Sequence, residues 1–458
     1  MPLTKQRPSV VGLAWADAYA AARDLPTALP PETVPVEDSR GRTLAEPVRA
    51  VTPVPAFDSA AMDGYAVAGP GPWTVVGLVL AGPMDRAGRE AGSHSMSDKS
   101  GIEAVPVAAT AHPGARPDTA KATPHPGARP GTTEAAHPGA GPDAADAAAP
   151  LVTSAASAVR LRPGTAAEIA TGAPVPGNAD AVLPYEDCHV GGGVVHGARG
   201  PRSHIRRAGD DVRARAVIVP AGETMTATRV AAAVQAGVEH VRVRRRPTVT
   251  LLVTGDEVVL GGRPGPGQVR DSFTGIVDAV TARAGGVLHA VRHVRDHPAE
   301  LAAALDTAGA DVVVVSGSSS AGAADHLHAL LDERDADWHV RGVACRPGHP
   351  QGLAARPGGR WVVSLPGNPY AGLVSVLTLL EPLLNALAGR PPVTLPAVPV
   401  SGAAKLVPGA VRIVPVRDGM LLPPGGSAGL AAVAAADALA VLPDHWRDGD
   451  PAPRLELP

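Results

Sequence analysis

Short apolar runs alternate with segments of helical period between residues 247 and 389. The runs end in polar or glycine-rich turns and predict buried strands, whereas the intervening segments space apolar residues three or four apart and predict helices. The predicted strands lie at the starts of 247–258, 286–298, 310–326 and 361–389, and the predicted helices lie in 272–286, 298–309 and the second half of 361–389. Strands that alternate with helices predict a three-layer α/β domain with a parallel-rich sheet covered on both faces.

The rest of the chain predicts shorter elements with more turns. A helix followed by extended chain is expected within 8–50, a strand at 73–82, short strands within 158–187, extended chain at 204–223 and a helix at 226–238. The fold class is therefore multidomain α/β plus β. The predicted domains are an elongated N-terminal domain (1–52 with 205–240), a small β domain (53–204), the α/β domain (241–391) and a C-terminal β domain (392–458).

One stretch inside the small β domain, at about 85–158, lacks the residues that build a core. It contains no aromatic residue, and HPGARP occurs at 112–117 and again at 125–130. Proline, glycine and small residues bury too little surface to offset the entropy of ordering, so we expect a disordered insertion. Its repeated histidines could alternatively be metal ligands, but they show no helical or strand spacing.

Composition and charge argue against several classes of protein function. The 458 residues suit two to four domains, and the net charge of −3 gives no sign of a nucleic-acid binder. Two cysteines argue against a disulfide framework and a thiolate metal site. No signal-peptide pattern and no run of about 18 apolar residues is seen, which predicts a cytoplasmic protein without membrane contact.

Four predicted strands of the α/β domain end in polar or small residues. These ends are Thr254–Glu257, Arg295–Asp296, Ser316–Ser320 and Leu365–Pro369. Ligands of open α/β sheets bind beyond the carboxyl ends of the strands. We therefore expect these four segments to line one rim.

The residue types at this rim suit an anionic ligand. A Ser/Gly loop presents backbone N–H groups, and Asn368 with Pro369 is typical of a helix start, where free N–H groups attract anions. Arg346–Pro350 adds a cation on a stiff turn. Hard oxygen ligands of the kind that Mg²⁺ prefers come from Asp256, Glu257, Asp271, Asp296 and Asp325. Each feature taken alone could be an ordinary cap or turn, and the patterns do not name the ligand.

The order of seven motifs resembles the molybdopterin molybdenumtransferase family, also called MoeA and the gephyrin E domain. They are FDSAAMDGYA (57–66), TGAPVPGNADAV (171–182), RRAGDDV (206–212), TGDEV (254–258), SGSSSAGAAD (316–325), RPGHP (346–350) and LPGNP (365–369). The resemblance implies a homodimer of four-domain subunits, each with an α/β molybdopterin-binding domain. It also implies insertion of molybdate into molybdopterin adenylate with Mg²⁺-dependent release of AMP, and contact with partner proteins of molybdenum-cofactor synthesis.

The resemblance also assigns roles to residues at matching positions. The catalytic residues would be Asp63, Thr171, Glu257, Asp325 and Arg346. The metal ligands would be Asp271 and Asp296. The substrate-binding residues would be Thr254, Gly255, Asp256, Ser272, Ser316, Gly317, Ser318, Gly348, His349, Pro366, Gly367, Asn368 and Pro369. Arg346 is the first candidate for holding molybdate.

Departures from the family pattern cluster at the expected site. The family usually reads SGGVSVGEAD, PGKP and DSN, whereas this chain has Ser318 in place of a glycine, Ala323 in place of an acidic residue, His349 in place of a lysine and Phe273 in place of an asparagine. Neutral histidine is a poorer partner for an oxyanion than lysine. A pterin-binding or scaffold protein with weakened catalysis is therefore one alternative, and a nucleotidyltransferase acting on a pterin is another.

Overall fold

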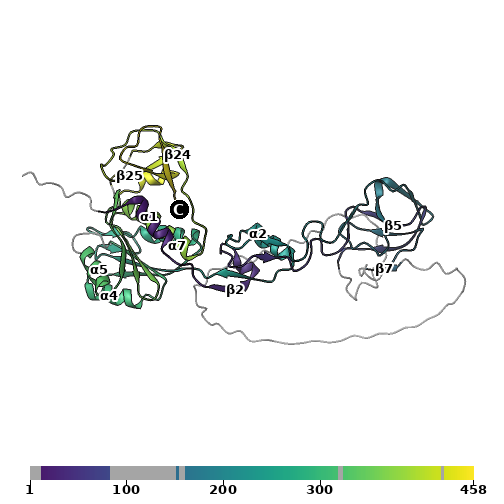
Figure 1. Cartoon of the computed structure of the whole chain (residues 1–458), viewed down its shortest axis with the longest axis horizontal. Helices are drawn as coiled ribbons and strands as arrows, with labels where there is room; N and C mark the ends of the chain where they lie inside the picture. The colour runs from purple at the N-terminus through teal and green to yellow at the C-terminus, as the bar shows by residue number, and fades with distance from the viewer. Residues whose placement is uncertain (1–11, 83–150, 154–159, 318–322, 424–425, 427) are drawn as a thin grey trace, which may run out of the picture. The chain divides into compact units, whose positions relative to one another are not determined.

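The structure is a computed structural model that describes residues 12–82, 151–153, 160–317, 323–423, 426 and 428–458 (Figure 1). The chain divides into two compact units. Residues 57–208 form one unit, and the remainder forms the other. Each unit is described by itself below.

A mixed sheet forms the centre of the α/β part of the larger unit. Its strand order is β18-β15-β19-β23-β22-β20. The strands are β15 (Thr248–Thr254), β18 (Val287–Val294), β19 (Val312–Ser316), β20 (Asp337–Arg341), β22 (Gly352–Arg356) and β23 (Arg360–Leu365). Neighbours from β18 to β23 run parallel, as the apolar runs predicted. Strands β22 and β20 add an antiparallel edge that the sequence pattern did not indicate.

Helices cover both faces of this sheet, which confirms the three-layer prediction. They are α3 (Phe273–Arg283), α4 (Pro298–Thr307), α5 (Ala323–Asp332), α6 (Pro369–Ser375), the π-helical turn η4 (Val376–Leu380) and α7 (Glu381–Leu387). Alternate residues of each strand enter different cores: Leu251 and Val314 pack with α3, α6 and α7, whereas Leu252 and Val313 pack with α4 and α5. Figure 1 shows α4 and α5 side by side.

The segment Pro369–Leu387 is one continuous helix that corrects a prediction. Over 19 residues its mean hydropathy is 1.5, so it is long and apolar enough to cross a membrane. The expectation of no such segment was therefore wrong. However, 83% of its apolar window is buried inside the protein, which identifies it as a core helix.

Helix α1 (Trp15–Asp24) packs on this core helix, as Figure 1 shows beside α7. Trp15 is buried, and its Nε1–H donates to Thr378 Oγ1 of η4 at 3.1 Å across 363 residues of sequence. The N-terminal helix thereby completes a core whose other members come from the second half of the chain.

A second sheet holds the C-terminal residues. Its order is β1-β21-β25-β27-β28-β24, with β26 beside β25. The elements are β1 (Leu13–Ala14), β21 (Val343–Arg346), β24 (Ala397–Pro399), β25 (Val411–Arg417), β26 (Met420–Leu421), α8 (Ala431–Ala434), β27 (Ala438–Leu442) and β28 (Pro451–Glu456). Strand β21 comes from the α/β region and runs parallel to β25, so that Arg346 lies beside Arg412. The predicted C-terminal β structure is present and includes two strands from earlier segments.

A small core with its own strands lies between α1 and the α/β part in sequence. It comprises β2 (Pro31–Pro35), η1 (Val36–Ser39), β3 (Val48–Arg49), β13 (Val217–Val219), α2 (Ala227–Gln235) and β14 (His240–Arg244). Helix α2 ends as predicted before Gly237, whose φ of +75° favours glycine. Strands β2 and β14 pair antiparallel.

The unit of residues 57–208 is a β structure with the strand order β10-β11-β6-β8-β5-β9 and β7 beside β6. Its elements are β4 (Ser59–Ala60), β5 (Gly64–Ala68), β6 (Trp73–Val79), β7 (Leu151–Thr153), β8 (Thr165–Ile169), β9 (Ala181–Pro184), η3 (Tyr185–Asp187), β10 (Cys188–Gly191), β11 (Val194–Gly197) and β12 (Ile205–Arg206). Strand β7 corrects the expected disorder at 85–158, because Leu151–Thr153 pairs in parallel with β6. Most of that stretch lies outside the described residues.

Candidate functional site

The four predicted strand ends do meet at one edge of the mixed sheet. Thr254 pairs with Val294, and Val253 pairs with Ser316, which itself pairs with Leu365. Because these strands are parallel and in register, the loops that follow them leave the sheet together. The prediction of a shared rim is therefore confirmed.

A cavity of about 800 Å³ opens over this edge, within the usual size range of small-molecule sites. It brings together most of the predicted site residues: Thr254, Gly255, Glu257, Asp271, Ser272, Asp296, Ser316, Gly317, Arg346, Gly348, His349, Pro366, Gly367, Asn368 and Pro369. The wall also contains Arg270 and Arg412, which sequence reasoning did not select, and Phe273, which it noted only as a departure from the family pattern.

The floor of the cavity is closely packed backbone. Thr254 Oγ1–H donates to the Ser316 carbonyl at 2.5 Å. Gly317 has φ +80°, and a Cβ there would lie 2.8 Å from Thr254 Oγ1. A Cβ on Gly367 would in turn lie 3.4 Å from Gly317 Cα. Glycine at position 317 is therefore required by both conformation and space.

Carboxylates gather at the β15 and β18 ends of the rim. Burial, together with the neighbouring charges of Glu257 and Asp256, raises the pKa of Asp296 above its usual range. The Asp296 N–H donates to Asp256 Oδ1 at 3.4 Å, although Asp256 itself does not line the cavity. Mutual repulsion among carboxylates is relieved by a cation, so the donor chemistry suits Mg²⁺.

No preformed metal cage accompanies these carboxylates in the described part of the chain. No three His, Cys, Asp or Glu side chains there converge closely enough to hold an ion. Mg²⁺ usually keeps several waters and binds through one or two carboxylates plus substrate phosphates. The residues present therefore fit a metal that arrives with a phosphorylated substrate.

The predicted ligand Asp271 also has a structural task. Its Oδ1 accepts the Phe273 N–H at 2.9 Å, and its Oδ2 accepts the Thr274 N–H at 3.3 Å. These contacts satisfy amides at the start of α3, where Ser272 occupies the N-cap position without a side-chain cap. Phe273 is buried, and a Cβ on Gly372 would overlap its ring. The aromatic residue at this position therefore fills core space beneath the cavity.

Two arginines of the second sheet line the cavity without a partner among the described residues. Arg346 ends β21 and Arg412 lies beside it on β25. Within the described residues, neither guanidinium forms a hydrogen bond or an ion pair, and both line the cavity. Two unpaired like charges at neighbouring positions are unfavourable unless an anion bridges them.

The turn between β21 and β22 is fixed by internal hydrogen bonds. The Val343 N–H donates to the His349 carbonyl at 2.9 Å, and the His349 ring Nδ1 lies 2.8 Å from the Val343 carbonyl. Buried Gln351 donates from Nε2 to the Gly348 carbonyl at 2.9 Å. The turn therefore holds His349 in place at the cavity wall.

Asn368 and Pro369 start the core helix as predicted. Asn368 is its N-cap residue and Pro369 its first residue, but the Asn368 side chain makes no capping hydrogen bond. The amide groups at this helix start lie at the cavity, where they favour negative charge.

Five predicted residues do not line the cavity as the structure describes it: Asp256, as noted above, and four others. Asp63 and Thr171 belong to the other compact unit, where Asp63 Oδ1 accepts the Thr171 N–H at 2.7 Å. Ser318 and the side chain of Asp325 lie outside the described part.

Comparisons with known proteins agree with this arrangement. Residues 13–237 match the family model of the MoeA N-terminal region (domains I and II), and residues 250–386 match that of a probable molybdopterin binding domain. Molybdopterin molybdenumtransferase 2 of Mycobacterium tuberculosis is 30% identical over 371 residues, which cover 79% of this chain and 76% of the relative.

The chain belongs to the molybdopterin molybdenumtransferase family. A second family member, from Nostoc sp., is 32% identical over 50% of this chain and 54% of its own length. The crystal structure of a MoeA protein of molybdopterin biosynthesis from Pyrococcus horikosii has the same fold. Its TM-score is 0.64 at 23% identity, with 97% of this chain and 98% of that chain covered. The predicted family and multidomain α/β plus β fold are confirmed, and the family consists of enzymes of molybdenum-cofactor biosynthesis.

Proposed function

We propose that this molybdopterin molybdenumtransferase family member inserts molybdate into molybdopterin adenylate and releases AMP in a Mg²⁺-dependent reaction. The observation that carries the proposal is the charge layout of the cavity. Arg346 and Arg412, which have no partner among the described residues, line the cavity from the second sheet, and the carboxylates around Asp296 line it from the ends of β15 and β18. A ligand that combines oxyanions with a divalent cation complements both walls.

The arginine wall suits tetrahedral oxyanions. Guanidinium groups bind such anions through paired N–H donors, and two adjacent groups can hold one dianion. Arg346 remains the first candidate for molybdate, and the structure adds Arg412 from β25 as its neighbour. The amides at the start of the core helix offer a separate place for a phosphate.

The carboxylate wall suits the metal. Asp296 with Glu257 would hold Mg²⁺, and Asp271 remains a predicted ligand even though its oxygens also cap α3. When bound, Mg²⁺ neutralises charge on the phosphoanhydride. Asp296 contributes by staying ionised once a cation offsets its carboxylate neighbours, and the amides at the start of the core helix contribute by favouring negative charge on the departing phosphate.

The remaining expectations belong to the same proposal. A homodimer would bring Asp63 and Thr171 of the β unit to a cavity as catalytic residues, with Asp325 completing the pterin-phosphate loop. A cytoplasmic location and partner proteins of cofactor synthesis are also proposed. Analytical ultracentrifugation checks the dimer.

The decisive experiment follows AMP release from molybdopterin adenylate by the purified chain. Molybdate and Mg²⁺ are supplied together, and reactions without molybdate or with EDTA are the controls. Release that needs both ions supports the transferase. Absence of AMP release while the pterin still binds overturns the proposed reaction and favours a pterin-binding scaffold.

A further inference from the structure

The ring of His293 is hydrogen-bonded to a loop that precedes it by 38 residues. His293 lies near the end of β18, and its Nε2 lies 2.8 Å from the carbonyl oxygen of Gly255, the first residue after β15. A carbonyl oxygen only accepts, so the ring donates from Nε2–H. His293 itself does not line the cavity. The bond therefore joins the edge strand of the mixed sheet to the loop that carries Glu257.

Both polar groups of the Gly255 backbone are bonded to β18. The Gly255 N–H donates to the Val294 carbonyl at 3.3 Å, and the Gly255 carbonyl accepts His293 Nε2–H. The same carbonyl also accepts the Val258 N–H at 3.2 Å, which closes the turn 255–258. Without the His293 ring, the Gly255 carbonyl would keep only this local bond within its own turn.

The position of the Glu257 carboxylate depends on Gly255. A Cβ on Gly255 would lie 2.8 Å from Glu257 Oε2, so the carboxylate is folded back against this glycine. The φ of Gly255 is +127°, a conformation that favours glycine. The Val269 N–H donates to the Glu257 carbonyl at 2.9 Å, which fixes the other side of the loop. A displacement of Gly255 would therefore displace the Glu257 carboxylate.

Asp296 follows His293 by three residues and reaches the same part of the rim. Its N–H donates to Asp256 Oδ1 at 3.4 Å. Burial raises the pKa of Asp296 most, and the charges of Glu257 and Asp256 raise it further, which shows that these carboxylates are within electrostatic reach of one another. Like charges repel, so a contact that ties the two loops together opposes their separation in the absence of a cation.

We propose that His293 is a positioning residue for a divalent cation. Its bond to Gly255 holds the loop after β15 against the end of β18, so that Glu257 and Asp296 offer their oxygens to the same ion. The inference rests on the proposed function for the identity of this ion as Mg²⁺. Partners that orient metal ligands without touching the metal typically change its affinity by about 10- to 100-fold.

Electron paramagnetic resonance of Mn²⁺ tests this role without turnover. Mn²⁺ prefers the same oxygen ligands as Mg²⁺, and the signal of the free ion reports how much the purified chain binds in the presence of AMP. His293→Leu removes the donor, whereas His293→Gln keeps an N–H donor. His289→Leu removes an exposed histidine of the same strand outside the cavity and is the matched control. The Mn²⁺ that is lost in Asp296→Asn identifies the ion bound at the cavity.

His293→Leu should weaken binding of the cavity ion by about tenfold, whereas His293→Gln and His289→Leu should stay within about twofold of the wild type. The affinity for AMP in EDTA, measured by isothermal titration calorimetry, should be equal in all of them, which separates a displaced carboxylate from a damaged cavity. Equal Mn²⁺ affinity in the wild type and His293→Leu overturns the inference, even if AMP release requires Mg²⁺.

A measurement without metal separates this inference from the proposed function. Amide hydrogen exchange at 255–258 in the free chain should be about fivefold faster in His293→Leu, because opening of the loop no longer breaks the bond from the ring. His293→Gln should exchange at the wild-type rate. Unchanged exchange in His293→Leu overturns the positioning role itself. Equal Mn²⁺ binding by the wild type and Asp296→Asn instead overturns the metal site of the proposed function.

Discussion

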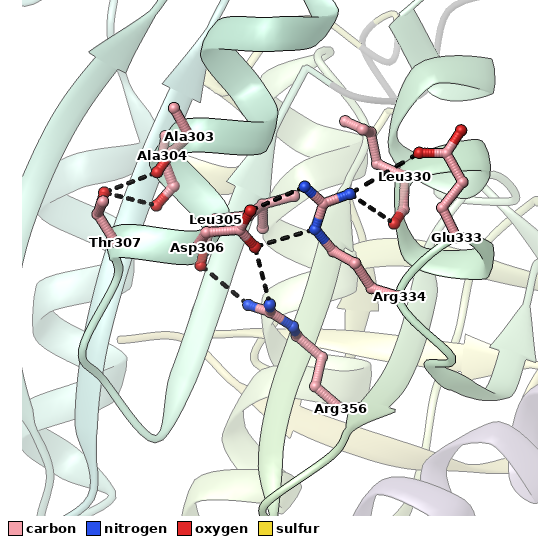
Figure 2. A network of polar contacts seen from close by, with 9 residues as sticks. All are labelled: Ala303, Ala304, Leu305, Asp306, Thr307, Leu330, Glu333, Arg334 and Arg356. Carbon is pink, nitrogen blue, oxygen red and sulfur yellow. Dashed lines mark hydrogen bonds and ion pairs between the residues drawn. The ribbon is translucent and has the colours of Figure 1, made fainter.

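At the amino ends of the mixed sheet, charged side chains meet opposite charges, whereas at the carboxyl ends of the same sheet they line a cavity. Figure 2 shows the first arrangement, in which Asp306 at the end of α4 accepts hydrogen bonds from Arg334 at 2.8 and 2.9 Å and from Arg356 at 3.1 Å. These contacts, Arg334 first, lower the pKa of Asp306.

A second paired carboxylate lies at the same amino edge. Asp311, just before β19, accepts Arg245 through two hydrogen bonds of 2.7 and 2.9 Å and also accepts the N–H and Oγ1–H of Thr248, each at 2.8 Å. Burial alone would raise the pKa of Asp311, but these hydrogen bonds outweigh it and lower the pKa. Arg245 thereby ties the chain entering β15 to the start of β19.

Charged side chains have different roles at the two edges of the mixed sheet. At the amino edge the protein supplies both partners, so the charges stabilise the fold. In the cavity at the carboxyl edge, Arg346 and Arg412 of the second sheet have no partner among the described residues, and the pKa of Asp296 is raised, so these charges favour a ligand over the empty state. Substitutions at the two edges should therefore separate activity from stability.

The largest effect is expected for Arg346→Ala. Loss of one charged donor at the reacting anion should lower kcat/KM for molybdate by about 100-fold. The midpoint of urea unfolding should hardly change, because Arg346 forms no hydrogen bond or ion pair within the described residues. AMP release kinetics measure the first effect, and Arg417→Ala, an exposed arginine on β25, is the control. An equal loss of kcat/KM in both variants would show that Arg346 is not part of the site.

Asp311→Ala should show the opposite pattern. Removing the carboxylate leaves Arg245 and Thr248 without their acceptor, and unfolding free energy should fall by about 2–3 kcal/mol. Turnover per folded molecule should stay within about twofold. Urea denaturation followed by circular dichroism measures the loss, and a variant as stable as the wild type would contradict the stabilising role of this edge.

Asp296→Asn tests the carboxylate wall. Turnover at limiting Mg²⁺ should fall by about tenfold, because a ligand of the metal is lost. Since the folded-state pKa of Asp296 is raised, its contribution to stability is present below the unfolded pKa and lost as pH rises through the folded value. The neutral amide should therefore leave the protein at least as stable at pH 7, which a thermal melt checks. An unchanged Mg²⁺ dependence would show that Asp296 does not bind the metal.

The smallest effect is expected for Asp306→Asn, at an exposed network. The loss of unfolding free energy should be under about 1 kcal/mol at pH 7. The lowered pKa of Asp306 means that its contribution is present above the unfolded value of about 3.9 and disappears as pH falls through the folded value. The wild type and the variant should thus converge in urea midpoint on acidification from pH 6, and a constant difference would contradict the charge pairing.

Sequence patterns predicted the parallel strands and their shared rim, because continuous apolar runs and the polar residues that end them are local signals. They did not predict the antiparallel edge of β22 and β20, since short strands with mixed polarity resemble turns. Arg412 also escaped prediction. Its place at the cavity depends on the pairing of β21 with β25, which joins segments about 65 residues apart, and a lone arginine in an alternating strand gives no local signal.

The roles assigned to individual site residues from sequence were also incomplete. The acidic residue Asp271 was predicted as a metal ligand from its type, yet only the structure shows both of its oxygens on α3 amides. Phe273 stands out in sequence as a departure from the family pattern, and its packing on Gly372 explains that departure as core filling. Such effects depend on neighbours that are distant in sequence.

The bond from Trp15 to Thr378 has a consequence for biosynthesis. Helix α1 is synthesised before the core helix on which it packs, because Thr378 follows Trp15 by 363 residues. At about 5–20 residues per second, the apolar face of α1 waits roughly 20–70 s for its binding surface. During that interval the nascent chain exposes Trp15, so a holdase that shields this helix would raise the yield of folded protein. A chain that lacks α1 would leave the surface of the core helix that α1 covers exposed to solvent.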